Sequence, residues 1–231
     1  MVDLKICGLC GERDIALCHR YGVDMVGFVV DYPEPVPWNL TQAEAKILLD
    51  RARGCLATCL VSGGPPAKLL ALAQALQPDA VQLHYKESFA ETVYLAEELA
   101  KLGIQVFKAL PVGADGRPEM AEFATLAQAV GAFNQTAVAR LLLDSRLAAS
   151  PAASSQPFPT RLYVEVARHS QKPLVLAGGL NTTNLPDILA ELQPAAVDIL
   201  SGAEAAPRQK DARRIAEIAH ICGKKPRLVV E

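Results

Sequence analysis

The chain has 231 residues, and 51% of them are hydrophobic, which is enough for one large α/β core or two small ones. Only 5% are aromatic, so the core must consist mainly of aliphatic side chains. The formal net charge is −2, from 23 basic and 25 acidic side chains, and this balance argues against nucleic-acid binding, which usually needs a clustered basic excess.

Short apolar runs recur along the chain and predict β-strands. They cover residues 4–8, 25–30, 55–61, 80–84, 105–110, 140–144, 174–177 and 196–200. Each run is almost continuously apolar, which is typical of strands that are covered on both faces.

The segments between these runs have the apolar spacing of helices. Helices are predicted at residues 41–53, 66–76, 89–102, 119–131, 160–169, 185–192 and 210–221. Regular alternation of strand and helix implies parallel strands joined by right-handed crossovers. Eight such units predict a (β/α)8 TIM barrel that forms a single domain over residues 1–231. The alternative is an open sheet, but the first turn (CGLCG, residues 7–11) lacks the G-x-G-x-x-G pattern of dinucleotide-binding folds.

Two loops interrupt the alternation. Residues 31–38 are rich in proline and follow the second predicted strand, and residues 145–159 are rich in Ala, Ser and Pro and follow the sixth. Long loops in compact domains are usually functional or disordered. Both follow the carboxyl end of a strand, which is the catalytic face of a barrel.

The N-terminus and the hydrophobic runs bear on localisation. The first residues lack the charged and apolar regions of a secretory signal, and no apolar run reaches the roughly 20 residues that span a membrane. We therefore expect a cytoplasmic protein with no membrane partner, in which the six cysteines are thiols.

Small residues follow the last two predicted strands. Gly178 and Gly179 come after the seventh strand, and Ser201 and Gly202 come after the eighth. Glycine lets backbone N–H groups approach an anion, and a helix N-terminus just beyond adds partial positive charge. These loops are the usual phosphate site of a barrel enzyme, so we predict a phosphate site here. The alternative for the two adjacent glycines is a tight strand-to-helix turn.

Cys7 and Asp144 lie at the carboxyl ends of the first and sixth predicted strands, with Cys7 just before Gly8. A carboxylate at the end of an apolar strand is costly unless it is paired or lies in a site. A thiolate and a carboxylic acid on separate strands form a plausible base and acid. The alternatives are a helix or loop cap for Asp144 and a small buried hydrophobic residue for Cys7.

Gln82 and His84 share one face at the end of the fourth predicted strand, because side chains alternate along a strand. Inward polar side chains at this position suggest contact with a ligand. The alternative is a hydrogen-bonded histidine at the barrel rim.

Cys7 and Cys10 form a C-x-x-C motif, which can be a redox pair or half of a zinc site. Thioredoxin-like folds are much shorter than this chain. Cys55 and Cys59 lie within one predicted strand, and no compact set of four ligands emerges. We therefore predict no metal.

In combination these residues resemble the phosphoribosylanthranilate isomerase family. The matching segments are residues 5–9 (KICGL), 27–29 (GFV), 81–84 (VQLH), 142–144 (LLD), 176–181 (LAGGLN), 201–204 (SGAE) and 210–211 (KD). They cover nearly the whole chain in the family's order, and the resemblance implies the barrel fold.

The resemblance implies an Amadori rearrangement of an aminoaldose phosphate to an aminoketose phosphate. Asp144 would be the general acid that protonates the ribose ring oxygen, and Cys7 would be the base that removes the proton from C2. The ligand would be a small-molecule sugar phosphate. No cofactor is implied, because the nitrogen of the substrate accepts the electrons. The protein could be a monomer or a homodimer.

The chain also departs from the family. Members usually carry an arginine after the second strand that holds the anthranilate carboxylate, but residues 33–37 are PEPVP, and Glu34 would repel a carboxylate. The glycine-rich segment usual after the sixth strand is replaced by AASPAASS at residues 148–155, and Leu200 stands where a serine is usual. Arg146 is a candidate replacement for the missing cation. These departures leave open a paralogue that acts on another phosphosugar, or a non-catalytic phosphate-binding barrel.

Overall fold

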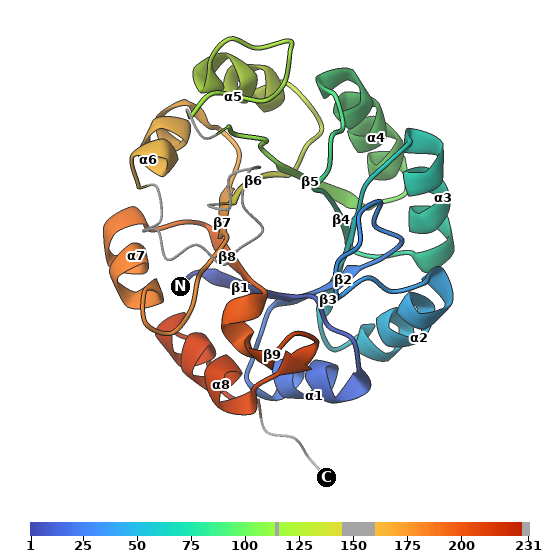
Figure 1. The fold of residues 1–231 in the computed structure, drawn as a ribbon, viewed down its shortest axis with the longest axis vertical. Coiled ribbons are helices and arrows are strands. Elements are labelled where there is room, and N and C mark those ends of the chain that lie inside the picture. Colours follow the sequence, from blue (N-terminus) through green and yellow to red (C-terminus); the bar gives the residue numbers. More distant parts are fainter. Residues whose placement is uncertain (114–115, 145–159, 228–231) are drawn as a thin grey trace.

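The structure, a computed structural model, describes residues 1–113, 116–144 and 160–227. A closed barrel of eight parallel strands, ordered β1 to β8, forms its centre, and helices surround it (Figure 1). The predicted (β/α)8 barrel is therefore confirmed. The strands are β1 Asp3–Cys7, β2 Met25–Val29, β3 Ala57–Ser62, β4 Ala80–Leu83, β5 Gln105–Ala109, β6 Arg140–Asp144, β7 Leu174–Ala177 and β8 Ala196–Ile199.

Every predicted strand is present, with bounds that differ by at most two residues. The largest difference is at β3, which begins at Ala57. The backbone N–H of Cys55 donates to the carbonyl of Ala52, so Cys55 still belongs to the turn after the preceding helix. The prediction that Cys55 and Cys59 lie within one strand is therefore wrong.

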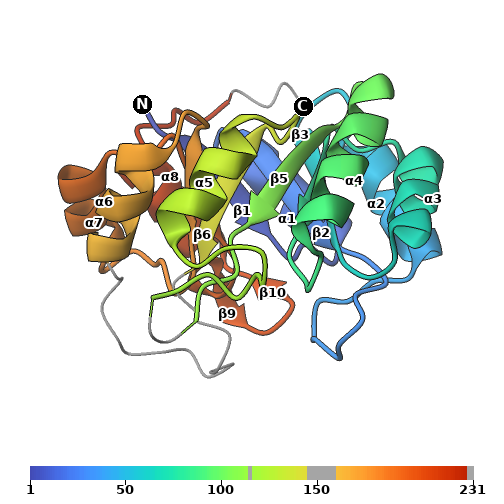
Figure 2. The same cartoon turned by 90° about the horizontal axis from the view of Figure 1, so that it is seen from above.

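Helices follow the strands in turn and cover the outside of the barrel (Figure 2). They are α1 Glu12–Arg20, α2 Gln42–Ala52, α3 Pro66–Leu76, α4 Phe89–Lys101, α5 Leu126–Asn134, α6 Thr160–His169, α7 Leu185–Leu192 and α8 Ala212–Ile221.

The start of α5 differs from the predicted helix over residues 119–131. Thr125 caps α5, because its side chain accepts from the N–H of Gln128 and the Gln128 side chain accepts from the N–H of Thr125. Before this cap, the N–H of Glu119 donates to the carbonyl of Pro111 in the loop after β5. The hydrophobic spacing therefore placed the helix start seven residues too early.

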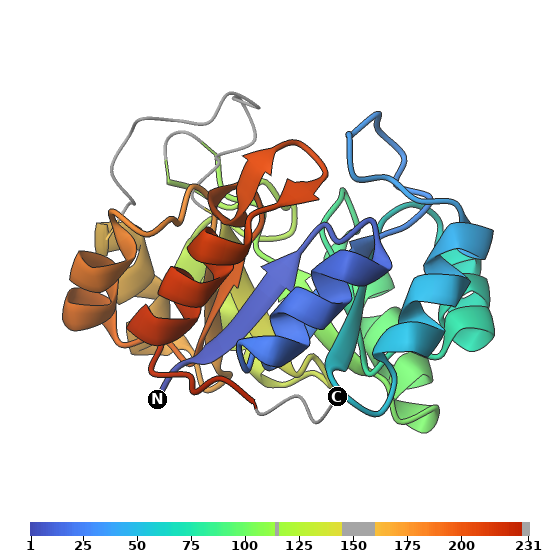
Figure 3. The ribbon, with the colours of Figure 1, turned by 90° about the horizontal axis from the view of Figure 1, so that it is seen from below.

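A hairpin that the sequence did not predict follows β8. A 3-10 turn, η1 Ser201–Ala203, leads into strands β9 Glu204–Ala206 and β10 Gln209–Lys210, which pair antiparallel. In Figure 3 this hairpin and the loop after β2 stand at the same end of the barrel, opposite the N-terminus.

Apolar side chains fill both layers of the fold. The larger cluster lies between the barrel and its helices. Inside the barrel, a smaller cluster includes Cys7, Val29, Cys59, Val61, Ala80 and Phe107. Within the described ranges, we find no helix with the length and apolar character needed to cross a membrane.

Candidate active site

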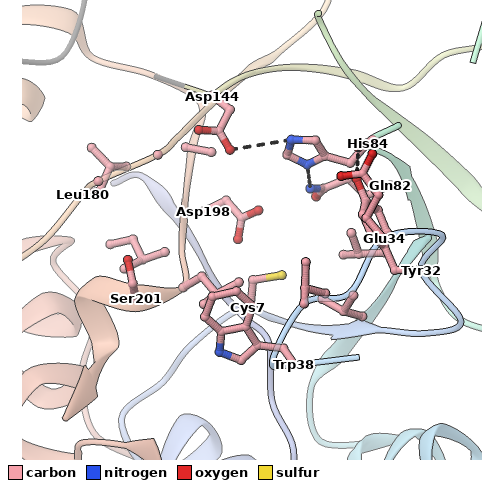
Figure 4. Close-up of a pocket in the computed structure, with 18 residues that line it drawn as sticks. Cys7, Tyr32, Glu34, Trp38, Gln82, His84, Asp144, Leu180, Asp198 and Ser201 are labelled. Atoms are coloured by element: carbon pink, nitrogen blue, oxygen red, sulfur yellow. Dashed lines mark hydrogen bonds and ion pairs between the residues drawn. The ribbon is translucent and has the colours of Figure 1, made fainter. Parts of the chain in front are cut away.

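A cavity of about 220 Å³ opens among the carboxyl ends of the barrel strands (Figure 4). Most of the predicted site residues line it, namely Cys7, Gln82, His84, Asp144, Gly178, Gly179 and Ser201. The closure of the barrel thus brings together side chains that are as much as 194 positions apart, from Cys7 to Ser201.

Gly202 and Arg146 are the remaining predicted site residues. Gly202 is not part of the cavity lining. A Cβ at Gly202 would lie 1.9 Å from the carbonyl oxygen of Leu180, so this glycine lets the loops after β7 and β8 pack directly against each other. Arg146 lies outside the described residues.

The loop after β7 has a backbone that only glycine adopts easily. Gly178 and Gly179 have φ angles of +87° and +62°. The side chains of Asn181 and Asn184 each donate to the carbonyl of Gly179, at 3.0 Å. Because the C=O and N–H of a trans peptide point in opposite directions, this turns the N–H of Leu180 away from the two asparagines. Gly178 and Gly179 can therefore form a tight turn and still let a backbone N–H face an anion, so the two interpretations of these glycines are compatible.

Asp144 lies beside His84 at the cavity wall. The Nε2 atom of His84 is 3.6 Å from Oδ2 of Asp144, which is within range of charge interaction but longer than a hydrogen bond. Gln82 donates from its Nε2 to Nδ1 of His84 at 3.0 Å, so in this arrangement Nδ1 accepts and the ring proton is on Nε2. Gln82 therefore orients the His84 proton toward the carboxyl group of Asp144.

A buried ion pair supports the loop that carries His84. Nζ of Lys108 on β5 lies 2.7 Å from Oε2 of Glu87, and both side chains are almost fully buried. The same carboxylate accepts from the N–H of Tyr85 at 3.2 Å. Burial lowers the pKa of Lys108, and the Glu87 carboxylate offsets this only in part. The pair anchors the turn from β4 to α4.

Cys7 is only 4% exposed, yet its side chain reaches the cavity (Figure 4). Burial raises the pKa of its thiol, whereas the nearby ammonium groups of Lys5 and Lys210 lower it. The free protein therefore holds Cys7 as a thiol near neutral pH. Cys7 is therefore both a buried side chain and part of the cavity lining, so the two interpretations of this residue do not exclude each other.

Lys5 and Asp198 form an ion pair inside the barrel that sequence reasoning missed. Nζ of Lys5 on β1 is 2.7 Å from Oδ2 of Asp198 on β8, and the two side chains are 4% and 6% exposed. Burial lowers the pKa of Lys5, but the carboxylate of Asp198 and the thiolate forms of Cys7 and Cys59 outweigh it, so the net pKa is raised. Asp198 lines the cavity, and its other carboxylate oxygen is buried and has no hydrogen-bond partner within the described part of the chain. The sequence signal that could have revealed this pair is a lysine and an aspartate, each within an otherwise apolar strand.

Trp38 forms part of the cavity wall and was also missed. Its Nε1 donates to Oε1 of Glu204 on β9 at 2.7 Å. The same oxygen lies 3.0 Å from Nζ of Lys210 on β10, and both of those side chains are buried. The hairpin after β8 therefore holds the loop after β2 in place.

The cysteines of the described segments are free thiols. Within those segments no cluster of three or more His, Cys, Asp or Glu side chains is arranged to hold a metal ion. The Sγ atom of Cys10 lies 3.6 Å from the carbonyl oxygen of Gly8, as the donor in a weak hydrogen bond.

Together, the closed parallel barrel and the cavity at the carboxyl ends of its strands are the features of a (β/α)8-barrel enzyme. The model of the N-(5'-phosphoribosyl)anthranilate (PRA) isomerase family matches residues 4–220. The N-(5'-phosphoribosyl)anthranilate isomerase 1 of Methanosarcina mazei is 30% identical over 216 residues, which cover 92% of this chain and 91% of that one. The chain belongs to the phosphoribosylanthranilate isomerase family.

Solved structures agree with this assignment. The phosphoribosyl anthranilate isomerase of Thermotoga maritima is 28% identical, with a TM-score of 0.78, over 96% of this chain and 100% of that one. A phosphoribosyl anthranilate isomerase in complex with reduced 1-(o-carboxyphenylamino)-1-deoxyribulose 5-phosphate is 27% identical, with a TM-score of 0.75, over 96% of this chain and 99% of that one. That neighbour holds a sugar-phosphate ligand.

Proposed function

We propose that this protein catalyses the Amadori rearrangement of an N-substituted phosphoribosylamine to the corresponding aminoketose phosphate. The observation that carries the proposal is the placement of Cys7 and Asp144, which reach one cavity from β1 and β6 (Figure 4). An acid and a base on different strands can act on neighbouring atoms of one bound sugar. The parent substrate of the family is phosphoribosylanthranilate.

Asp144 acts first, as the general acid. Its carboxyl group donates a proton to the ribose ring oxygen, the C1–O bond breaks, and the nitrogen lone pair forms an iminium with C1. His84, whose Nε2 lies 3.6 Å away, stabilises the carboxylate that remains. The nitrogen of the substrate accepts the electrons of the next step, so the proposal needs no cofactor and no metal.

Cys7 acts second, as the general base. Its thiolate removes the proton from C2, and the C–H electrons form an enolamine between C1 and C2. Proton transfer to C1 then turns the C2 hydroxyl into the ketone. The ammonium of Lys5 lowers the pKa of the buried Cys7 thiol and so favours the reactive thiolate.

The phosphate binds at the loops after β7 and β8. Gly178, Gly179 and Ser201 line this side of the cavity, and Gly202 allows the loops to approach each other. Backbone N–H groups supply the hydrogen bonds, since glycine leaves them accessible. Gln82 and His84 contact the sugar on the opposite wall.

Further parts of the proposal concern the whole chain. Residues 1–231 form a single domain that acts in the cytoplasm as a monomer or homodimer. Its partner is a small-molecule sugar phosphate, with neither nucleic acid nor membrane involved. Arg146, outside the described residues, is a proposed cation for the substrate.

A fluorescence assay with freshly generated phosphoribosylanthranilate tests the proposal. The wild type should turn it over, and both Cys7→Ala and Asp144→Asn should lose that rate. Cys18→Ala is the matched control, because Cys18 is a fully buried thiol on α1 that does not line the cavity. Full activity in either site variant would remove that residue from the mechanism, and a wild type without activity would defeat the proposal for this substrate.

A further inference from the structure

The cavity has two chemically different ends. In Figure 4, Leu180 and Ser201 lie at one end, and Tyr32 and Glu34 lie at the other, with Cys7 and Asp144 between them. If the loops after β7 and β8 hold the phosphate, the ribose lies against Cys7 and Asp144. The substituent on the amine is then directed to the end formed by the loop after β2.

Aromatic side chains form walls at this amine end. The ring of Tyr32 packs edge-on against Tyr85, with centroids 5.8 Å apart, and its hydroxyl donates to the carbonyl of His84 at 2.6 Å. Val36 and Trp38, from the same loop as Tyr32, also line the cavity. Flat, largely apolar walls of this kind suit an aromatic ring on the amine.

The charge at the amine end is negative. Glu34 lines the cavity, and its Oε1 lies 4.0 Å from Nζ of Lys86, with both side chains more than half exposed. Such an exposed pair leaves much of the Glu34 charge uncompensated. No lysine or arginine within the described segments lines the cavity. A carboxylate on the ring would therefore meet like charge.

The loop that presents Glu34 and Trp38 is held in this shape. Asn39 accepts from the N–H of Tyr32 at 2.9 Å and donates to its carbonyl at 3.1 Å, which closes the loop on itself. The Arg208 guanidinium donates to the carbonyl of Pro37 at 2.8 Å and does not line the cavity. The amine end is thus preformed, and Arg208 of the hairpin is already engaged by the backbone of the loop.

Resting on the proposed function, we propose that the amine end, formed by Tyr32 and Glu34, selects an aromatic amine whose ring carries a neutral hydrogen-bonding substituent over one that carries a carboxylate. The carboxylate of Glu34 accepts a hydrogen bond from such a substituent. The aromatic walls hold the ring. Glu34 is the residue that decides between the two substrates.

Two adducts that differ only in this substituent test the inference. Ribose 5-phosphate condensed with anthranilate carries a ring carboxylate, and ribose 5-phosphate condensed with 2-aminobenzamide carries a neutral carboxamide at the same position. We expect kcat/KM to be at least about tenfold higher for the carboxamide adduct. Glu34→Gln should reduce this preference, and Glu34→Arg should reverse it. Glu12→Gln, an exposed change on α1 outside the cavity, should leave it unchanged.

The outcomes separate this inference from the proposed function. A preference for the anthranilate adduct would overturn the inference and leave the proposed reaction in place. If Arg146→Ala then abolished this preference, Arg146 would be the residue that binds the ring carboxylate. If neither adduct is turned over, the proposed function fails. Trp38 is the only tryptophan of the chain, so quenching of its fluorescence by each adduct then decides the selectivity by binding. Equal or tighter binding of the anthranilate adduct would overturn the inference.

Discussion

Lys5 and Asp198 meet across the seam where β1 pairs with β8, with Nζ 2.7 Å from Oδ2. The Lys5 ammonium balances the buried carboxylate and also lowers the pKa of Cys7, which burial raises. One buried cation thus stabilises the barrel seam and the proposed catalytic base. This shared role leads to the first two predictions.

The rate should depend on pH through Cys7. Because burial raises its pKa above the usual thiol value, Cys7 is mostly protonated near neutral pH, and the thiolate fraction grows as pH rises toward that pKa. We expect kcat/KM to increase about tenfold per pH unit over this range. A stopped assay across pH 6 to about 10 measures it. In Cys7→Asp, whose carboxylate ionises at lower pH, this alkaline rise should disappear, and its persistence would assign the rise to another group.

Lys5→Met should destabilise the protein and slow catalysis. It leaves the Asp198 carboxylate buried without its partner, which typically costs about 3–5 kcal/mol, and it raises the pKa of Cys7 further. Urea unfolding and thiol titration measure the two effects. The double variant with Asp198→Leu should regain most of the stability without regaining the rate. Unchanged thiol titration in Lys5→Met would show that Lys5 has no influence on Cys7.

Gly202→Ala should weaken both stability and phosphate binding. Its new Cβ would lie 1.9 Å from the backbone oxygen of Leu180, which cannot move aside as a side chain could. Overpacking of this kind typically costs about 1–3 kcal/mol. The shift of the melting temperature with inorganic phosphate should also shrink. Gly131→Ala is the control, since that position on α5 has nothing within 4 Å of an added Cβ. It should stabilise slightly, and equal behaviour of the two variants would refute the packing argument.

Gln82→Leu should lower kcat by about tenfold, with a smaller rise in KM from the lost contact with the sugar. The variant loses the donor to Nδ1 of His84, so the proton that faces Asp144 on Nε2 is no longer fixed in place. Gln82→Glu should lower kcat further, because a carboxylate would favour the doubly protonated imidazole, and that cation would hold Asp144 as a carboxylate with no proton to donate. Steady-state kinetics with both variants distinguish an effect of Gln82 on the orientation of His84 from an effect on packing. A loss in KM alone would indicate that Gln82 contacts substrate without orienting His84.

Local patterns account for the elements and for much of the site. A continuous apolar run between helical segments is a short-range property, so each strand could be predicted to within two residues. Cys7 and Asp144 were found because they end such runs, and Gly178 because a glycine follows one. The start of α5 was missed although its signal is also local, since the Thr125 and Gln128 capping box was read as part of a longer helical pattern.

What the sequence by itself determined is therefore the strand and helix order and the set of polar residues at the strand ends, because hydrophobic period and turn chemistry act over a few positions. Only the tertiary structure decided which of them meet. Lys5 reaches Asp198 across 193 positions, and Trp38 reaches Glu204 across 166. Such contacts depend on the closure of the barrel and on the packing of its loops, and no short window of residues encodes them. The charge at the amine end of the cavity is likewise a property of the assembled barrel.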